Sequence, residues 1–127
     1  MSQNNKNSIC LIHSDPDINN LFTIFLEHYG YHVNCFTNPS EGLLSLAEEQ
    51  PDLVMCELII CENDDTNIYK TLKDIDNQVR ILIITANLKC AELIQDKYPE
   101  IKNQVIIEPI SLTKLKSEVE SILVNVN

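Results

Sequence analysis

The sequence predicts an α/β fold in which a five-stranded parallel sheet is covered by helices on both faces. Two observations predict this class. Five apolar runs of strand length alternate along the chain with five segments whose apolar residues recur at helical spacing. The strand segments are almost continuously apolar, which is typical of parallel strands that are buried on both sides.

The first half of the chain contains two strand–helix units. Turn-forming residues follow the first strand, and either Ser14 or Asp15 can cap the first helix. Gly30 ends this helix, and the second helix begins at residues 38–40. The two strands are predicted at residues 8–13 and 31–36. The apolar helix residues are Ile18, Leu21, Phe22, Phe25 and Leu26, and then Leu43, Leu44, Leu46 and Ala47.

The second half contains three further units. Pro51 ends the second helix, and a polar loop at residues 61–65 separates the third strand from the third helix. Ser111 can cap the last helix. The remaining strands are predicted at residues 52–60, 79–85 and 104–108. The apolar helix residues are Ile68, Tyr69, Leu72 and Ile75 in the third helix, and Leu112, Leu115, Val119, Ile122 and Leu123 in the fifth, while the fourth helix covers residues 88–97.

The size and composition of the chain exclude several classes of function. A length of 127 residues fits one domain, which we place at residues 8–127 after a disordered tail at residues 1–7. The net charge of -10 argues against a nucleic-acid partner, because phosphate binding needs clustered Lys and Arg. Only two glycines occur, which excludes Gly-rich nucleotide-binding loops.

The lengths of the apolar runs predict the location of the protein, and the number and spacing of the cysteines predict their chemistry. No apolar run is long enough to span a membrane, and the start is polar, so we expect a cytoplasmic protein without membrane contact. Five cysteines form an odd set without a CxxC pair. We therefore expect neither a disulfide framework nor a zinc knuckle, and mostly buried thiols.

Polar residues gather at one predicted edge of the sheet. Ligands of open α/β sheets bind at the carboxyl ends of the strands, beside the switch in strand order. In this sequence that edge carries His13, Ser14, Asp15, Glu57, Thr85 and Glu108.

Three segments at this edge resemble the response regulator receiver (CheY-like) family of two-component phosphorelay signalling. Residues 51–57 (PDLVMCE) are similar to the segment that leads into the family's phosphoacceptor aspartate. Residues 83–86 (IITA) resemble the switch segment, and residues 106–109 (IIEP) resemble the fifth strand with its lysine and cis proline. The resemblance covers Ile9 to Leu123. It implies a flavodoxin-like, doubly wound (βα)5 fold with strand order 2-1-3-4-5.

The resemblance also assigns positions, most of which hold unexpected residues. Glu57 stands at the phosphoacceptor position, and His13 and Ser14 stand where the family has a magnesium-binding acidic pair, with Asp15 next to them. Thr85 retains the switch hydroxyl, whereas Val105 replaces the switch aromatic residue. Glu108 replaces the phosphate-binding lysine, and the Glu108–Pro109 bond is expected to be cis.

These replacements predict a degenerate pocket. Imidazole and hydroxyl groups do not supply the charge that Mg²⁺ needs, so we expect weak or absent magnesium binding and no cofactor. The longer Glu57 is poorly placed for phosphoryl transfer, and Glu108 would repel a phosphoryl group. Glu57 could instead act as a fixed mimic of the active state, or both glutamates could be solvated residues without a role. For His13 we expect a bond to Glu57 or to a backbone carbonyl rather than a ligand role.

We therefore predict a stand-alone, non-enzymatic pseudo-receiver that signals by protein–protein contact in or beside a phosphorelay. By resemblance, a histidine kinase, another signalling protein or a second copy of the chain would bind the face formed by the fourth helix, fifth strand and fifth helix. One alternative is a working receiver that a histidine kinase phosphorylates. A second is a small metal- or ligand-binding flavodoxin-like module, with His13, Glu57 and Glu108 as metal ligands of allowed types.

Overall fold

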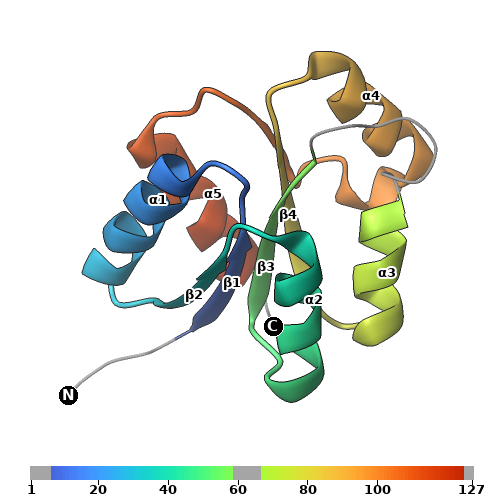
Figure 1. Cartoon of the computed structure of the whole chain (residues 1–127). Coiled ribbons are helices and arrows are strands. Elements are labelled where there is room, and N and C mark those ends of the chain that lie inside the picture. The colour runs from blue at the N-terminus through green and yellow to red at the C-terminus, as the bar shows by residue number, and fades with distance from the viewer. Residues whose placement is uncertain (1–6, 59–66, 125–127) are drawn as a thin grey trace.

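The computed structural model describes residues 7–58 and 67–124 and has a five-stranded parallel sheet at its centre (Figure 1). The strand order is β2-β1-β3-β4-β5, with helices on both faces of the sheet, which confirms the predicted fold class. The predicted loop at residues 61–65, the end of the third predicted strand and residues 1–6 of the predicted tail lie outside the described residues.

The observed elements match the predicted segments to within a few residues. The strands are β1 Ser8–Ile12, β2 His32–Phe36, β3 Leu53–Glu57, β4 Arg80–Thr85 and β5 Val105–Ile107. The helices are α1 Pro16–His28, α2 Pro39–Glu48, α3 Asn67–Ile75, α4 Leu88–Lys97 and α5 Leu112–Val124, and a short 3-10 helix, η2, covers Pro99–Ile101.

Polar side chains begin the helices that lead away from the functional edge. The Asp15 carboxylate accepts hydrogen bonds from the backbone N–H groups of Asp17 and Ile18, and so caps α1. Asn87 caps α4 in the same way through Cys90 N. At the other end of α1, Gly30 has a φ of 95°, a left-handed conformation that glycine adopts without strain.

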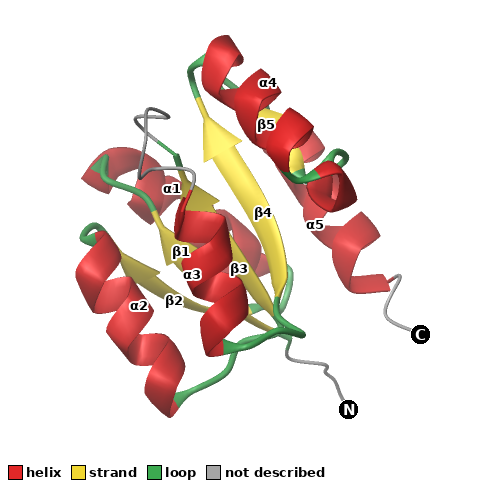
Figure 2. Ribbon diagram, turned by 90° about the vertical axis from the view of Figure 1, so that its right-hand side faces the viewer, coloured by secondary structure: helices red, strands yellow, loops and turns green. Residues whose placement is uncertain are grey.

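The sheet separates two hydrophobic cores. Alternate strand residues such as Ile12, Val54 and Ile83 pack under α2, α3 and α4. Their neighbours, such as Leu11 and Met55, pack under α1 and α5. Figure 2 shows the two helix layers on opposite sides of the strands. Because both faces are buried, each strand is apolar at almost every position.

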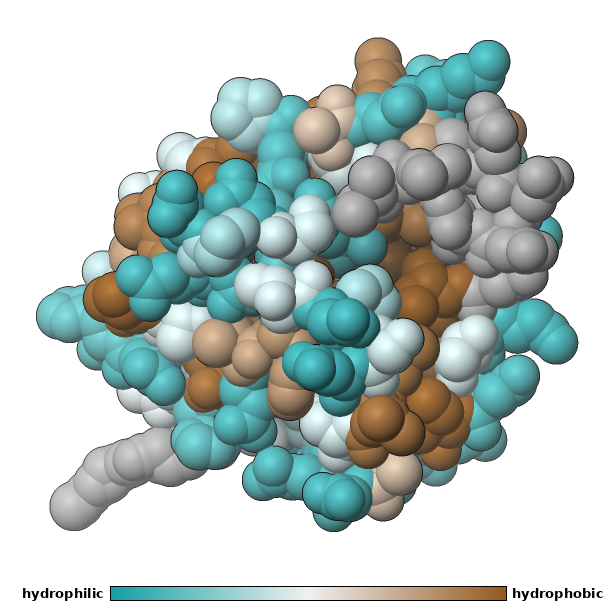
Figure 3. Space-filling model, viewed as in Figure 1, coloured by the Kyte–Doolittle hydropathy of each residue, from teal (hydrophilic) through white to brown (hydrophobic). Residues whose placement is uncertain are grey.

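Four of the apolar helix residues are exposed rather than buried. Leu21 on α1 is 46% exposed, Leu44 on α2 is 71% exposed and Ile75 on α3 is 37% exposed, and Ala47 on α2 is exposed as well. Leu21 lies directly before the buried Phe22, and Leu44 lies two positions before the buried Leu46, so both stand at the margin of the apolar stripe of their helix. Figure 3 shows an apolar band over the region where α2 and α3 lie side by side.

The cysteine prediction holds for some residues and fails for Cys90. Cys10 and Cys56 are free and buried, while Cys35 is free and exposed. Cys90 is disulfide-bonded, whereas we expected mostly free, buried thiols and no disulfide framework. Sequence spacing could not show this bond, because it depends on which cysteines the fold brings together.

Helix α2 approaches β1 closely at Gly42. A Cβ atom placed on Gly42 would lie 2.6 Å from both Cγ1 and Cδ1 of the buried Ile12. Glycine is therefore needed here for space rather than for backbone conformation. Across the part of the chain that the structure describes, no helix has the length and apolar character to cross a bilayer.

Candidate functional site

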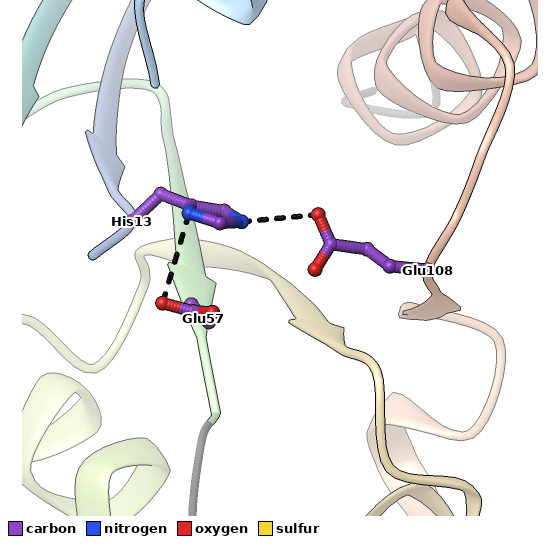
Figure 4. Close-up of side chains that lie close together, drawn as sticks. All are labelled: His13, Glu57 and Glu108. Carbon is purple, nitrogen blue, oxygen red and sulfur yellow. Dashed lines mark hydrogen bonds and ion pairs between the residues drawn. The ribbon is translucent and has the colours of Figure 1, made fainter. Parts of the chain in front are cut away.

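Three side chains from three strand ends meet at the carboxyl edge of the sheet (Figure 4). His13 follows β1, Glu57 ends β3 and Glu108 follows β5. The imidazole lies between the two carboxylates, with Nε2 3.0 Å from Glu108 Oε2 and Nδ1 3.7 Å from Glu57 Oε1. The structure thus brings together three of the six residues that the sequence placed at this edge.

His13 is held firmly from the backbone side. The backbone N–H of His13 donates a hydrogen bond to Phe36 O at 3.0 Å, and the His13 side chain is 3% exposed. The N–H of Asp15 donates to Nδ1 at 3.2 Å, so Nδ1 acts as an acceptor. This assigns the proton of the neutral ring to Nε2, which donates it to Glu108. The main partner of His13 is therefore Glu108, rather than Glu57 or a backbone carbonyl as we expected.

Glu57 is anchored by the turn after β1. Its Oε1 accepts a hydrogen bond from Ser14 N at 2.8 Å, and its side chain is 16% exposed. The same carboxylate therefore contacts both the backbone of the first strand–helix turn and the neighbourhood of His13.

Five other predicted site residues stay outside this cluster. The Ser14 side chain is exposed, and the Asp15 carboxylate is used to cap α1. Thr85 is fully buried, and its Oγ1 accepts from Asn87 N at 3.1 Å. Val105 is partly buried and packs against the core under α4. The Glu108–Pro109 peptide bond is cis, and the Pro109 ring is exposed.

A cavity of about 570 Å³ opens beside Glu57, between the ends of β3 and β4 and the start of α4. Its lining residues are Glu57, Leu58, Thr85, Ala86, Asn87, Leu88 and Lys89. The Glu57 side chain, which is 16% exposed, therefore forms part of the cavity wall.

Asn19 is a site-forming residue that sequence reasoning missed. It is 4% exposed, and its Nδ2 donates to both His13 O and Phe36 O, at 3.2 and 3.0 Å. It therefore ties α1 to the ends of β1 and β2 and fixes the backbone that carries the imidazole. The available signal was an amide residue next to the apolar stripe of α1, where a buried polar group needs partners.

The cluster contains no compensating cation. Within residues 7–58 and 67–124, neither Glu57 nor Glu108 forms an ion pair with Lys or Arg. Among the described residues, the group that lies near both carboxylates and can offset their charge is the imidazole. Chemically, the arrangement can hold a cation or a proton, and it would repel an anion.

Comparisons with known proteins place this site in context. The family model described as "Response regulator receiver domain" matches residues 9–120. The chain is 28% identical over 116 residues to the response regulator receiver protein CpdR of Brucella abortus, an alignment that covers 91% of this chain and 96% of that protein.

Solved structures show the same fold at low sequence identity. A response regulator from Thermotoga maritima superposes with a TM-score of 0.83 at 17% identity, covering 95% of this chain and 100% of that one. A two-component response regulator from Clostridium difficile gives a TM-score of 0.81 at 21% identity, with coverages of 95% and 98%.

Proposed function

Because this chain belongs to the response regulator receiver domain family, we propose that it is a signalling protein that acts by protein–protein contact and without phosphorylation. We infer that it catalyses no reaction of its own. The single observation that carries this proposal is the contact between Glu108 and His13.

Glu108 occupies the position where the resemblance places a phosphate-binding lysine. Its carboxylate lies 3.0 Å from the imidazole of His13 and is 15% exposed. A phosphoryl group on Glu57 would meet this carboxylate instead of an ammonium group, so its negative charge would be opposed rather than stabilised. We infer that the adduct would be disfavoured even if it formed.

The residues at this edge do not fit the magnesium ion of the family. Mg²⁺ prefers oxygen ligands in tight octahedral geometry. Here an imidazole and a serine stand at the acidic-pair positions, and the Asp15 carboxylate is engaged with Asp17 N and Ile18 N. We infer that magnesium binding is weak or absent, and no step of the proposed function depends on it.

A fixed pocket suits a protein that presents one surface to its partner. Glu57 is bonded to the turn after β1, and His13 links that turn to the residue after β5. These contacts exist without any modification. We propose that they hold the receiver in one conformation, in which the ionised Glu57 side chain takes the place of a phosphoryl group.

We propose that the partner contacts the face of α4, β5 and α5. Three large apolar residues on α4 and β5 support this choice, since Leu88, Leu93 and Ile107 are 58%, 43% and 44% exposed. Helix α4 lies beside β5 at this edge of the sheet, as Figure 2 shows. The partner would be a histidine kinase, another signalling protein or a second copy of the chain.

The proposed function is tested by exposing the purified chain to acetyl phosphate with Mg²⁺ and measuring its intact mass. We expect no phosphate adduct. A stable adduct at Glu57 would instead support a working receiver that is phosphorylated by a histidine kinase.

A further inference from the structure

We propose that His13, Glu57 and Glu108 bind one divalent transition-metal ion of the zinc class at the carboxyl edge of the sheet. This site goes beyond the proposed signalling function, since a signalling receiver of this kind would act equally well with the edge unbound.

The three side chains are already arranged around a common point. One ligand atom from each residue lies within 4.8 Å of the others. Metal–ligand bonds of about 2.0–2.2 Å in a tetrahedral site place ligand atoms roughly 3.4 Å apart. The closest pair, His13 Nε2 and Glu108 Oε2, is at 3.0 Å. Rotations within the two glutamate side chains can supply the remaining change, because both carboxylates lie at the partly exposed rim.

Each carboxylate has an oxygen to offer. Glu57 uses Oε1 for Ser14 N, and Glu108 uses Oε2 for His13. For the other oxygen of each group, no hydrogen bond or ion pair exists within the described ranges 7–58 and 67–124. A metal ion can therefore bind these oxygens while Ser14 N keeps its acceptor.

The imidazole can provide the nitrogen ligand through a change of tautomer. An ion on Nε2 takes the lone pair there, and the ring proton moves to Nδ1. The Nδ1–H then faces the N–H of Asp15, so the two donors must move apart and the 3.2 Å bond between them is lost. This loss is part of the cost of binding, and the attraction between the ion and the two carboxylates offsets it.

The negative charge of the two glutamates also favours a bound divalent cation. The two carboxylates share one neutral ring, and no Lys or Arg pairs with them in the described part of the chain. A divalent cation would neutralise this pair of charges. Imidazole nitrogen with carboxylate oxygen suits zinc and its neighbours, whereas magnesium requires oxygen ligands and keeps its water.

The test is calorimetric titration of the full chain with Zn²⁺ and, separately, with Mg²⁺, in a buffer without thiols. We expect one Zn²⁺ per chain with a Kd below about 0.1 mM and much weaker Mg²⁺ binding. The Cys35→Ser variant is titrated alongside, because Cys35 is the exposed free thiol among the described residues.

Matched variants locate the ion. Glu108→Gln keeps an acceptor for His13 but removes the charge, and it should weaken Zn²⁺ binding by at least about tenfold, as should Glu57→Gln and His13→Asn. The controls His32→Asn and Glu92→Gln change exposed residues outside the site and should leave the affinity unchanged. Circular dichroism in EDTA checks that each variant is folded. If His13→Asn does not fold, the comparison of Glu108→Gln with the controls still tests the proposed site.

Amide NMR gives an independent readout, with zinc-induced shifts expected at Ser14, Glu57 and Glu108. The proposal is overturned if no Zn²⁺ binds, if Mg²⁺ binds as tightly, or if affinity is lost with Cys35→Ser or His32→Asn and retained in the site variants.

Discussion

His13 Nε2 lies 3.0 Å from Glu108 Oε2, although β1 and β5, which precede these residues, are separated in the sheet by β3 and β4. The contact therefore crosses the whole functional edge. It joins the position of a family acidic residue to the position of the family lysine, and it satisfies both side chains within the protein. Because of this internal pair, a carboxylate stands where phosphoryl chemistry would need a cation.

Beryllofluoride with Mg²⁺ should leave the protein unchanged. The phosphoryl mimic needs a cation opposite Glu57, and the structure has the Glu108 carboxylate there. Amide NMR before and after addition checks this. Shifts centred on Glu57 and Thr85 would contradict it.

Restoring four residues together should restore phosphoryl chemistry. The change is His13→Asp, Ser14→Asp, Glu57→Asp and Glu108→Lys, which supplies two metal-facing carboxylates, a shorter acceptor and a cation. We expect Mg²⁺ binding and acetyl-phosphate labelling at position 57, measured by calorimetry and intact mass.

Single reversions are the control for the fourfold variant. Because these groups act as a unit, each single change should give almost no labelling. If the combined variant folds but neither binds Mg²⁺ nor takes up phosphate, then the loss extends beyond the side chains of the pocket.

The strand and helix segments could be predicted because local patterns determine them. Buried strands are continuously apolar, and Asp15, Asn38 and Gly30 mark helix ends through their own side-chain or backbone chemistry. The set of residues at the functional edge followed from parallel topology alone.

The pairings within the site could not be predicted in the same way. Which carboxylate His13 contacts depends on side-chain direction across four strands, and no local pattern encodes that distance. The role of Asn19 was hidden for the same reason, because its partners His13 O and Phe36 O lie on two different strand ends.

Exchange protection on complex formation or self-association should appear on α4, β5 and α5. Hydrogen–deuterium exchange and sedimentation over a concentration series measure this. Leu93→Asp should weaken the association, because it places a charge on the 43% exposed apolar residue of α4.

Ile24→Asp on α1 is the matched control, since Ile24 is 59% exposed but lies on another face. If Ile24→Asp weakens association and Leu93→Asp does not, or if protection is confined to α1 and α2, the proposed contact face is wrong.

Gly42→Ala should destabilise the fold despite the better helix propensity of alanine. The added Cβ would meet Ile12 Cγ1 and Cδ1 at 2.6 Å, and Ile12 is only 2% exposed. Overpacking of this kind typically costs about 1–3 kcal/mol, against a propensity gain of about 1 kcal/mol. Urea unfolding measures the difference, and Gly30→Ala, where the strain is in φ rather than in space, provides a comparison.

The free thiols should differ sharply in reactivity. Burial raises the pKa of the Cys10 thiol to about 11 and that of Cys56 to about 12, from an ordinary value of 9.0. At pH 8 a disulfide reagent should therefore modify the exposed Cys35 much faster than either buried thiol. Peptide mapping by mass spectrometry distinguishes the three sites, and rapid modification of Cys56 in the folded protein would contradict the prediction.

The same pKa shifts imply an alkaline limit of stability. The unfolded thiols ionise near pH 9, whereas the folded ones resist ionisation until about pH 11 to 12. The free energy of unfolding should therefore be unaffected by these groups below pH 9 and should fall as the pH rises above it.

The contact between His13 and Glu108 also affects the rate at which the protein unfolds. The His13–Glu108 contact joins residues 95 positions apart, so it can form only after β1, β3, β4 and β5 have assembled. Interactions that form after the transition state mainly slow unfolding. Residues that in a switching receiver govern chemistry would in this chain govern the lifetime of the folded state.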